Sequence, residues 1–183
     1  MKNQTRTLLI LLAALLCAVA CKKSNIHPEP AKVSFIETKV PLANHHLAAF
    51  SIIKNSKYLV VFESGLGDSH LVWYKNDVSL QISNVMDVLL YYRASRGDSE
   101  NGPTPRNITR LEGELDSIID YFSNGRKIIL VGHSLGGLII RDYAIKNSGK
   151  IAALLFVDPS HEAYSHPSQA DEDAMYNSLN SSY

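Results

Sequence analysis

The sequence predicts an α/β fold, with a mostly parallel sheet that carries helices on both faces. Four short runs are apolar and rich in β-branched residues, which is typical of strands buried on both sides. These runs cover residues 58–63, 85–92, 127–131 and 151–157. Longer segments between them carry apolar residues at helical spacing. This alternation of strands and helices indicates parallel strands joined by crossover helices.

A hairpin is predicted ahead of this sheet. Residues 33–40 and 46–53 have the composition of strands, and the turn-like segment Pro41-Leu42-Ala43-Asn44 separates them. The first buried strand, at 58–63 (YLVVFE), follows and ends at Ser64-Gly65-Leu66-Gly67. In sheets of this kind, active sites lie at the carboxyl ends of the strands.

Three segments are predicted to be helices. Residues 70–82 follow the first buried strand and are expected to form one helix. Residues 107–122 carry apolar residues at gaps of three and four, with Pro105 as a start signal and Gly125 as a stop signal. The third helix, at 135–146, follows a predicted strand directly.

A motif with chemical meaning lies between the strand and the third helix. It reads Gly132-His133-Ser134-Leu135-Gly136, which is G-x-S-x-G in the strand–turn–helix context that this motif requires. A serine on such a turn has strained backbone dihedrals and needs small neighbours, which Gly132 and Gly136 provide. The amide of Leu135, at the start of the helix, can stabilise an oxyanion. We therefore predict that Ser134 is a nucleophile.

The alternative interpretation of this motif is a tight turn with an incidental serine. The buried strand before the motif and the helix after it favour the nucleophile. His133 is adjacent to the serine in the sequence, but on such a turn its side chain points away from the serine. We therefore predict a packing role for His133.

The chain resembles the alpha/beta-hydrolase superfamily over about residues 33–164. Four segments match landmarks of that family in the same order. They are residues 60–67 followed by Trp73, residues 91–99, Pro105-Arg106 and Val157-Asp158-Pro159. Three positions depart from the family's pattern. Ser64 stands where a histidine is frequent, Tyr92 stands where the family has an aspartate, and Ser95 stands where it has a glycine.

This resemblance implies an alpha/beta-hydrolase fold, here without its last strands, and serine-hydrolase chemistry. Ser134 would attack an ester or related acyl bond, and water would then hydrolyse the acyl-enzyme. The backbone amides of Leu135 and Leu66 would form the oxyanion hole, where one donor is typically worth about 3–4 kcal/mol of barrier. The resemblance implies no cofactor and no metal, and the histidines do not follow a metal-ligand pattern.

The acid and the base of the catalytic triad are less clearly placed. The family order is nucleophile, acid and then histidine, and only residues 135–183 follow Ser134. We therefore expect a portion of a hydrolase that stops before both, and that is inactive toward short acyl esters or poorly soluble when made alone. The competing interpretation takes Asp158 as the acid, with His161 or His166 as the base.

The first residues predict a bacterial lipoprotein signal. Lys2 and Arg6 precede an uncharged stretch at 8–20, which is too short to span a bilayer but fits a secretory signal. The stretch ends in Ala18-Val19-Ala20-Cys21, so we expect cleavage after residue 20 and lipid attachment at Cys21. A plain signal peptide is the alternative. The predicted organisation is a signal peptide at 1–20, a tether at 21–32, a partial alpha/beta-hydrolase domain at 33–165, and the start of a lid or a disordered tail at 166–183.

Charge limits the classes of partner. The formal net charge of the 183 residues is zero, and removal of a signal with two bases and no acid leaves a net charge of about −2. Without a basic excess, nucleic acid is a poor partner. We expect a small acyl substrate and attachment through Cys21 to a bacterial membrane, on the periplasmic side, with the cell surface as the alternative. The alternative functions are a non-catalytic, lipid-anchored binding domain and an acyltransferase that uses the same serine.

Overall fold

The computed structural model describes residues 34–75 and 77–161. The strands are β1 (Ile36–Pro41), β2 (His46–Ile52), β3 (Tyr58–Glu63), β4 (Asp87–Tyr91), β5 (Lys127–Ser134) and β6 (Ile151–Pro159). The helices are α2 (Leu71–Tyr74), α3 (Val78–Ile82), α4 (Ile108–Ser123) and α5 (Leu135–Lys146). None of the helices in this described part is long and apolar enough to cross a membrane.

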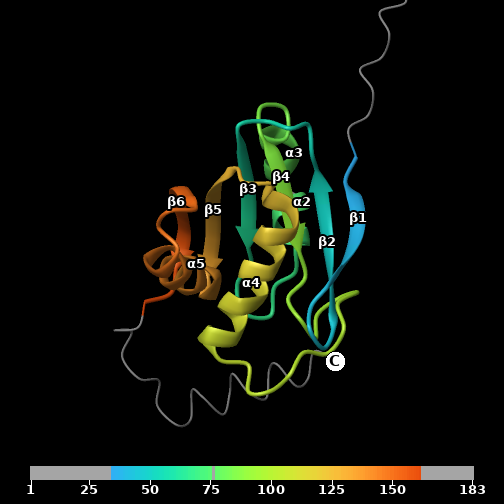
Figure 1. Ribbon diagram of the computed structural model, residues 1–183, viewed down its shortest axis with the longest axis vertical. Helices are drawn as coiled ribbons and strands as arrows, with labels where there is room; N and C mark the ends of the chain where they lie inside the picture. The colour runs from blue at the N-terminus through green and yellow to red at the C-terminus, as the bar shows by residue number, and fades with distance from the viewer. Residues whose placement is uncertain (1–33, 76, 162–183) are drawn as a thin grey trace, which may run out of the picture. The chain divides into compact units, whose positions relative to one another are not determined.

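The six strands form one sheet in the order β1-β2-β4-β3-β5-β6 (Figure 1). The β1–β2 hairpin and the β2–β4 pair are antiparallel. The β3–β4, β3–β5 and β5–β6 pairs are parallel. The predicted mostly parallel sheet with an opening hairpin is therefore confirmed, and the carboxyl ends of β3 and β5 meet at the same edge.

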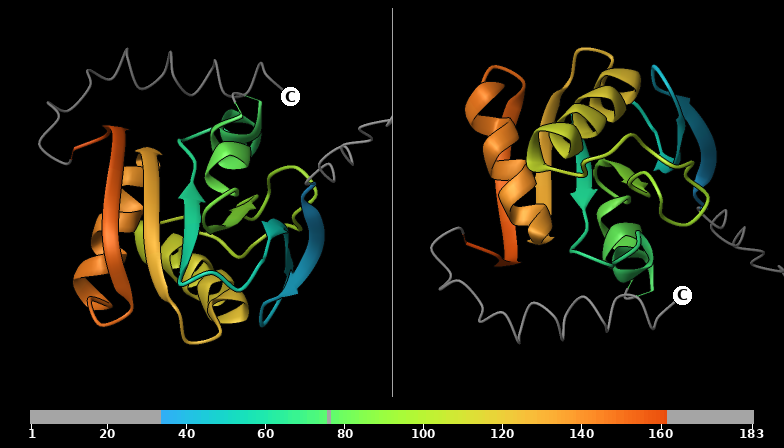
Figure 2. Two further views of the ribbon diagram at one scale, coloured as in Figure 1. Left: turned by 90° about the horizontal axis from the view of Figure 1, so that it is seen from above. Right: turned by 90° about the horizontal axis from the view of Figure 1, so that it is seen from below.

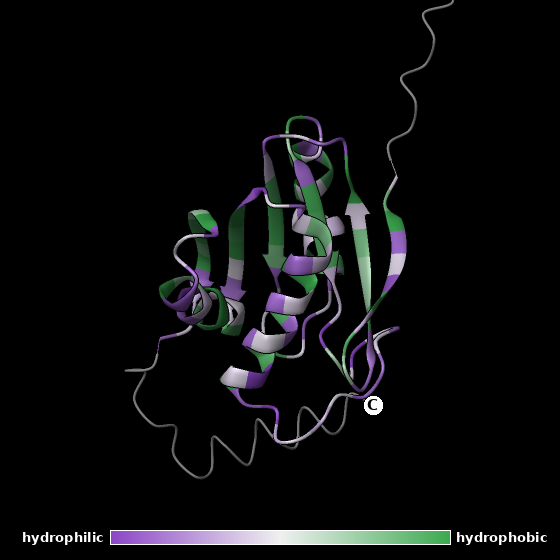
Figure 3. Cartoon of the chain, in the orientation of Figure 1, coloured by the Kyte–Doolittle hydropathy of each residue, from purple (hydrophilic) through white to green (hydrophobic). Residues whose placement is uncertain are grey.

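Helices cover both faces of the sheet (Figure 2). Because successive side chains of a strand point to opposite faces, Leu59 and Val61 of β3 join one core cluster and Val60 and Phe62 join another. The first cluster contains residues of α4 and α5, and the second contains Trp73 of α2. Hydrophobic residues accordingly concentrate on the central strands (Figure 3). Each fully buried apolar side chain contributes about 1.5–3 kcal/mol to folding.

The ends of α4 follow the predicted signals. The side chain of Asn107 accepts a hydrogen bond from the amide of Arg110 at 3.1 Å and so caps the first turn. Asn124 (φ 46°) and Gly125 (φ 75°) both have left-handed backbone conformations, which end the helix. The chain then turns into β5.

The prediction of one helix over residues 70–82 is wrong. The structure has two short helices there, and Asp77 between them has a left-handed backbone with φ 57°. The amide of Asp77 donates to the carbonyl of Tyr74 at 3.1 Å, and its own carbonyl accepts from Gln81 at 2.8 Å. Aspartate tolerates this conformation better than most residues, which allows the break between α2 and α3.

The prediction that residues 151–157 form a strand is confirmed, but their expected burial on both faces is wrong. Within the described part of the chain, β6 is last in the strand order and pairs with β5 alone. Leu155, Phe156 and Val157 are 54%, 41% and 39% exposed. A Cβ on Gly137 of α5 would lie 3.5 Å from the Phe156 ring, so α5 packs beside Phe156 and still leaves it 41% exposed. The apolar composition of this strand therefore reports strand propensity.

Candidate active site

Ser134 lies at the sharp turn where β5 ends and α5 begins. Its backbone has φ 49° and ψ −120°, a conformation that L-residues rarely adopt. A Cβ on Gly132 would lie 2.7 Å from the carbonyl oxygen of Gly136, and a Cβ on Gly136 would overlap the carbonyl oxygen of Glu63. The turn thus requires small residues on both sides of the serine, at the positions that the sequence motif singles out.

The hydroxyl of Ser134 is half-buried and lies next to Ser160, which follows β6. The two Oγ atoms are 3.2 Å apart, and the amide of Ser160 donates to the carbonyl of Ser134 at 3.0 Å. The segment after β6 therefore runs beside the serine. A hydroxyl hydrogen bond of this kind orients the serine, but a second hydroxyl is too weak a base to activate it.

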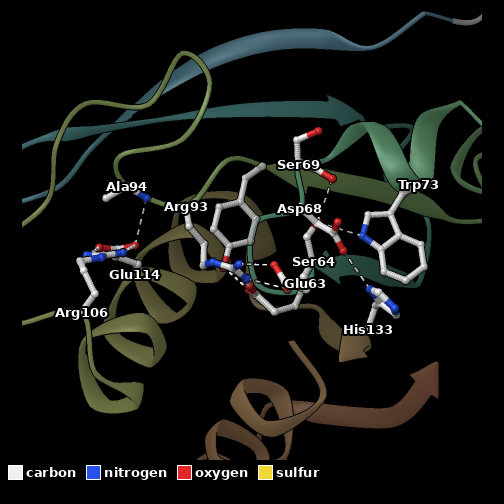
Figure 4. A network of polar contacts seen from close by, with 12 residues as sticks. Glu63, Ser64, Asp68, Ser69, Trp73, Arg93, Ala94, Arg106, Glu114 and His133 are labelled. Carbon is white, nitrogen blue, oxygen red and sulfur yellow. Dashed lines mark hydrogen bonds and ion pairs between the residues drawn. The ribbon is translucent and has the colours of Figure 1, made fainter. Parts of the chain in front are cut away.

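The side chain of His133 contacts the loop after β3 and the ring of Trp73, in agreement with the predicted packing role. Its Nδ1 lies 3.0 Å from Oδ2 of Asp68, in the loop after β3. Its ring also lies edge-on to Trp73, with 6.4 Å between the ring centroids. His133 thereby connects the end of β5 to that loop (Figure 4).

The two residues predicted to supply the oxyanion amides border the same cavity. Leu66 lies in a tight turn that closes with a 3.3 Å hydrogen bond from the amide of Asp68 to the carbonyl of Gly65. Leu135 is the first residue of α5. Both leucines line a cavity of about 360 Å³. Its other lining residues are Gly67, Arg93, Ala94, Ser95, Arg96, Arg106 and Leu111.

A buried guanidinium holds the loop after β3 in place (Figure 4). Arg93 donates to Oε1 of Glu63 and to the carbonyl of Ser64, both at 2.6 Å, and also to the carbonyl of Gly65. Glu63 is 1% exposed, and its second oxygen accepts from the hydroxyl of Tyr91. These hydrogen bonds fix the backbone that leads into Leu66. Sequence patterns did not reveal this network, although Arg93 lies in the family-like segment 91–99.

The pKa values of this network follow from its burial. Burial raises the pKa of Glu63 above its usual range, and the charge of Arg93 only partly offsets this effect. The pKa of Tyr91 is raised well above its usual range by burial and by the neighbouring Glu63. Burial alone would lower the pKa of Arg93, but the Glu63 carboxylate outweighs it and the net shift is upward. Arg93 is therefore a permanent cation.

A second buried carboxylate supports another part of the cavity lining. Glu114 of α4 is 2% exposed and pairs with Arg106, with 2.7 Å between Oε2 and Nη2. The same oxygen accepts from the amide of Ala94 at 3.3 Å, and Oε1 lies 3.4 Å from Nε2 of His45. The cavity next to Ser134 is therefore lined by guanidinium groups that buried carboxylates hold in place.

Ser64, which stands where the family often has a histidine, has its own hydrogen bonds. Its Oγ accepts from Nε1 of Trp73 and donates to the carbonyl of Ser69, both at 3.2 Å. Ser64 and Trp73 are both buried. The substitution thus leaves the loop connected to α2.

Of the remaining predicted site residues, the structure describes Asp158 and His161. Asp158 is exposed at the end of β6, with φ 43°, and its side chain makes no hydrogen bond or ion pair with another described residue. His161 is exposed at the last described position. His166 and Cys21, with the predicted signal, tether and lid, lie outside the described residues. Among residues 34–75 and 77–161, no group of three or more His, Cys, Asp or Glu side chains could hold a metal ion.

The sheet order, the strained serine turn after β5 and the loop after β3 together define the hydrolase class of α/β folds. Residues 58–179 match the family model described as the alpha/beta hydrolase fold. This match covers more than half of the chain, and the chain belongs to that family.

Curated relatives are similar over part of their length. An uncharacterized protein of Bacillus subtilis, YqjL, is 27% identical over 106 residues, which are 58% of this chain and 41% of that protein. The (lyso)-N-acylphosphatidylethanolamine lipase of Bos taurus is 33% identical over 107 residues, which are 55% of this chain and 30% of that protein. The chain therefore spans less than half the length of these relatives.

Solved structures share the fold. A hydrolase from Pseudomonas aeruginosa has a TM-score of 0.63 at 21% identity, and the similarity covers 82% of this chain and 54% of that one. The thioesterase domain from the curacin biosynthetic pathway has a TM-score of 0.65 at 18% identity, over 80% of this chain and 53% of that domain. At these identities the likeness concerns the fold alone.

Proposed function

We propose that the chain carries the nucleophile half of a serine hydrolase that acts on an ester or related acyl bond. The observation that carries this proposal is the backbone of Ser134, a non-glycine residue at φ 49° and ψ −120°. Such conformations cost roughly 1–3 kcal/mol each and cluster at active sites. Here the strained turn lies at the carboxyl edge of the sheet, and the next residue, Leu135, lines a cavity.

In the proposed reaction, Oγ of Ser134 forms a bond to the acyl carbon and gives its proton to a general base. The amides of Leu66 and Leu135 stabilise the oxyanion of the tetrahedral intermediate. The bond to the leaving group then breaks, and the base returns the proton to that group. A water molecule then attacks the acyl carbon and gives a proton to the base, the bond to Oγ of Ser134 breaks, and the base returns the proton to Oγ.

We propose that the acid and the base come from positions after residue 166. This assignment follows the family order of nucleophile, acid and histidine. Asp158, with His161 or His166 as the base, is the competing assignment. Asp158 is exposed and its side chain makes no hydrogen bond within the described part of the chain, so the geometry gives it less support.

The proposed substrate is a small acyl compound. One relative is a lipase of (lyso)-N-acylphosphatidylethanolamine, and one structural neighbour is a thioesterase domain. Both names describe acyl hydrolysis, which agrees with the chemistry proposed for Ser134. An alcohol or amine acceptor in place of water would make the same site an acyltransferase, and product analysis with added acceptor alcohol separates the two.

A fluorophosphonate probe tests the nucleophile. It forms a covalent bond with an activated serine, and intact-mass spectrometry counts the adducts. We expect one adduct on the wild-type chain and on Ser160→Ala, and none on Ser134→Ala. Ser160 is the matched control because its hydroxyl lies 3.2 Å from that of Ser134. A wild-type chain that takes no probe would contradict an activated Ser134 and would favour a non-catalytic binding domain or a chain without its acid and base.

We also propose that the chain is exported and anchored to a bacterial membrane by a lipid on Cys21, on the periplasmic side. The support is the positive start, the uncharged stretch and the small residues before the cysteine. Metabolic labelling with a palmitate analogue should mark the wild-type protein and leave Cys21→Ser unmarked. Equal labelling of the two proteins would contradict the proposal.

A further inference from the structure

The cavity beside the two proposed oxyanion amides is lined by three arginines. Arg93 and Arg96 come from the loop after β4, and Arg106 precedes α4. None of the described residues that line this cavity is acidic. Its volume of about 360 Å³ falls in the range of small-molecule sites, roughly 300–1,000 Å³. The acyl chemistry proposed for Ser134 gives these positive charges no role.

The guanidinium of Arg93 keeps two hydrogen-bond donors for a ligand. An arginine side chain has five N–H groups in a planar fork. Arg93 uses three of them within the protein, two on Nη1 and one on Nη2, which donate to Glu63, Ser64 and Gly65. The other two, on Nε and Nη2, have no partner among the described residues. They form one edge of the guanidinium, and such an edge matches the two oxygens of a carboxylate.

This edge is open to a ligand. Several side-chain polar atoms in the described part of the chain are both unpaired and closed off from solvent, and Nε of Arg93 is not one of them. The side chain of Arg93 is 8% exposed, while that of its partner Glu63 is 1% exposed. The positive group of this buried pair is therefore the one that a bound molecule can reach.

Arg106 shows the same relation to its own carboxylate (Figure 4). Both of its Nη atoms donate to Glu114, with 2.7 Å between Nη2 and Oε2. The side chain of Arg106 is 25% exposed and that of Glu114 is 2% exposed. The cavity thus receives the positive end of two ion pairs, with the negative end buried behind each.

The charges at the cavity do not cancel. Three guanidiniums and the carboxylates of Glu63 and Glu114 together carry a net charge of +1 when both carboxylates are ionised. A phosphate monoester carries about −1.5 to −2 at pH 7, whereas a carboxylate carries one negative charge. The excess of one positive charge therefore suits a carboxylate better.

The acids of the neighbouring loops have other partners. Glu100 accepts from the backbone amide of His46 at 2.9 Å. Asp98 acts electrostatically on His70, which lines a different cavity. Asp68 lies 3.0 Å from the histidine of the serine motif. None of these three carboxylates lines the arginine cavity, so they leave it to an anion from outside.

From these contacts we propose that the cavity binds the carboxylate of an acyl ester, so that the substrate of Ser134 is a singly charged ester of a short dicarboxylic acid. This proposal rests on the function proposed for Ser134. The carboxylate accepts from Nε and Nη2 of Arg93. The ester carbonyl oxygen lies at the amides of Leu66 and Leu135, and these two leucines border the same cavity and contact the short carbon chain.

Monomethyl and dimethyl glutarate separate charge from shape, because the first carries one carboxylate and the second carries none. Binding is measured by calorimetry on the full chain with Ser134→Ala, which cannot consume either ester. We expect the monoester to bind at least about tenfold more tightly, a factor that corresponds to roughly 1.4 kcal/mol. Equal affinities, or no binding of the monoester, would overturn the proposal.

A matched pair of variants locates the binding. Arg93 and Arg106 each pair with a buried carboxylate, so the charge is removed at Arg96. Arg110 of α4 is also half-buried but does not line the cavity, and its Nε donates to a backbone carbonyl. We expect Arg96→Met to weaken monoester binding at least about threefold and Arg110→Met to leave it unchanged, with thermal denaturation showing that both fold. An unchanged affinity in Arg96→Met, or an equal loss in both, would contradict this site.

The two proposals fail separately. Binding is measured without the hydroxyl of Ser134, whereas fluorophosphonate labelling requires that hydroxyl. A wild-type chain that takes the probe, with no preference for the monoester, overturns the carboxylate site and leaves the nucleophile in place. A preference for the monoester in a chain that takes no probe supports the carboxylate site and counts against the acyl chemistry alone.

Discussion

The Asp68 carboxylate lies 3.0 Å from Nδ1 of His133, and this contact joins the loop after β3 to the strand that ends at Ser134. The two side chains are 32% and 34% exposed. A Cβ on Gly65 would lie 2.9 Å from the same Nδ1, so the loop backbone packs directly on the histidine. The pair therefore sets where the amide of Leu66 lies relative to the serine.

Removing this contact should affect reactivity more than stability. We expect Asp68→Ala to slow fluorophosphonate labelling of Ser134 several-fold, because the loop that carries Leu66 loses its connection to β5. The free energy of unfolding should fall by less than about 1 kcal/mol, as is usual for partly exposed pairs. Asp142→Ala, which removes an exposed pair with Lys146, is the control and should label at the wild-type rate. Equal rates for both variants would rule out positioning by Asp68.

The buried Glu63–Arg93 pair predicts that loss of Arg93 lowers the free energy of unfolding by an amount that depends on pH. Burial raises the pKa of Glu63 in the folded protein above the ordinary value of 4.5. The stability that this carboxyl contributes is therefore fully present below about pH 4.5 and is lost as the pH rises through the folded pKa. Arg93 opposes this loss, because its charge stabilises the carboxylate.

We expect Arg93→Met to lower the free energy of unfolding by about 3–5 kcal/mol at pH 7.5, because it leaves a buried carboxylate unpaired. The deficit should be clearly smaller at pH 4, where Glu63 is largely protonated. Urea denaturation at the two pH values measures both numbers. Adding Glu63→Gln should recover part of the loss at pH 7.5. A deficit that does not change with pH would mean that the hydrogen bonds to Ser64 and Gly65, not the charge, carry the effect.

Local signals predicted the elements of this fold well because they depend on neighbours along the chain. The helix of residues 108–123 follows its own cap and stop residues, and the serine turn follows its flanking glycines. The features that sequence patterns missed depend on partners far away in the chain. Arg93 meets Glu63 across thirty residues, and periodicity carries no information about such a pair.

The two local predictions that failed have different physical causes. A single helix was expected over residues 70–82, but Asp77 adopts a left-handed conformation and breaks it. The burial of residues 151–157 was expected from their apolar composition. Burial, however, depends on what other segments cover a strand, and composition does not report that.

Steric contacts predict opposite effects on stability for alanine at two glycines, Gly136 and Gly113. A Cβ on Gly136 would lie 2.8 Å from the carbonyl oxygen of Ser64, while a Cβ on Gly113 has no atom within 4 Å. We expect Gly136→Ala to destabilise the protein by about 1–3 kcal/mol, because two backbones must separate. Gly113→Ala, inside α4, should stabilise it by about 0.5–1 kcal/mol. Thermal denaturation measures both, and a tolerated Gly136→Ala would contradict the close approach of α5 to β3.

The exposed apolar side chains of β6 predict a solubility effect. A flat apolar edge strand promotes association, and a lysine on such an edge opposes it. We expect Leu155→Lys to reduce light scattering during storage and to change the free energy of unfolding by no more than about 0.5 kcal/mol, because Leu155 is 54% exposed. Leu130→Lys, at a fully buried position of β5, is the control and should unfold the protein. If Leu155→Lys unfolds it as well, Leu155 is covered in solution, either by a segment outside the described residues or by a second copy of the chain. Scattering that does not fall would place the association surface away from β6.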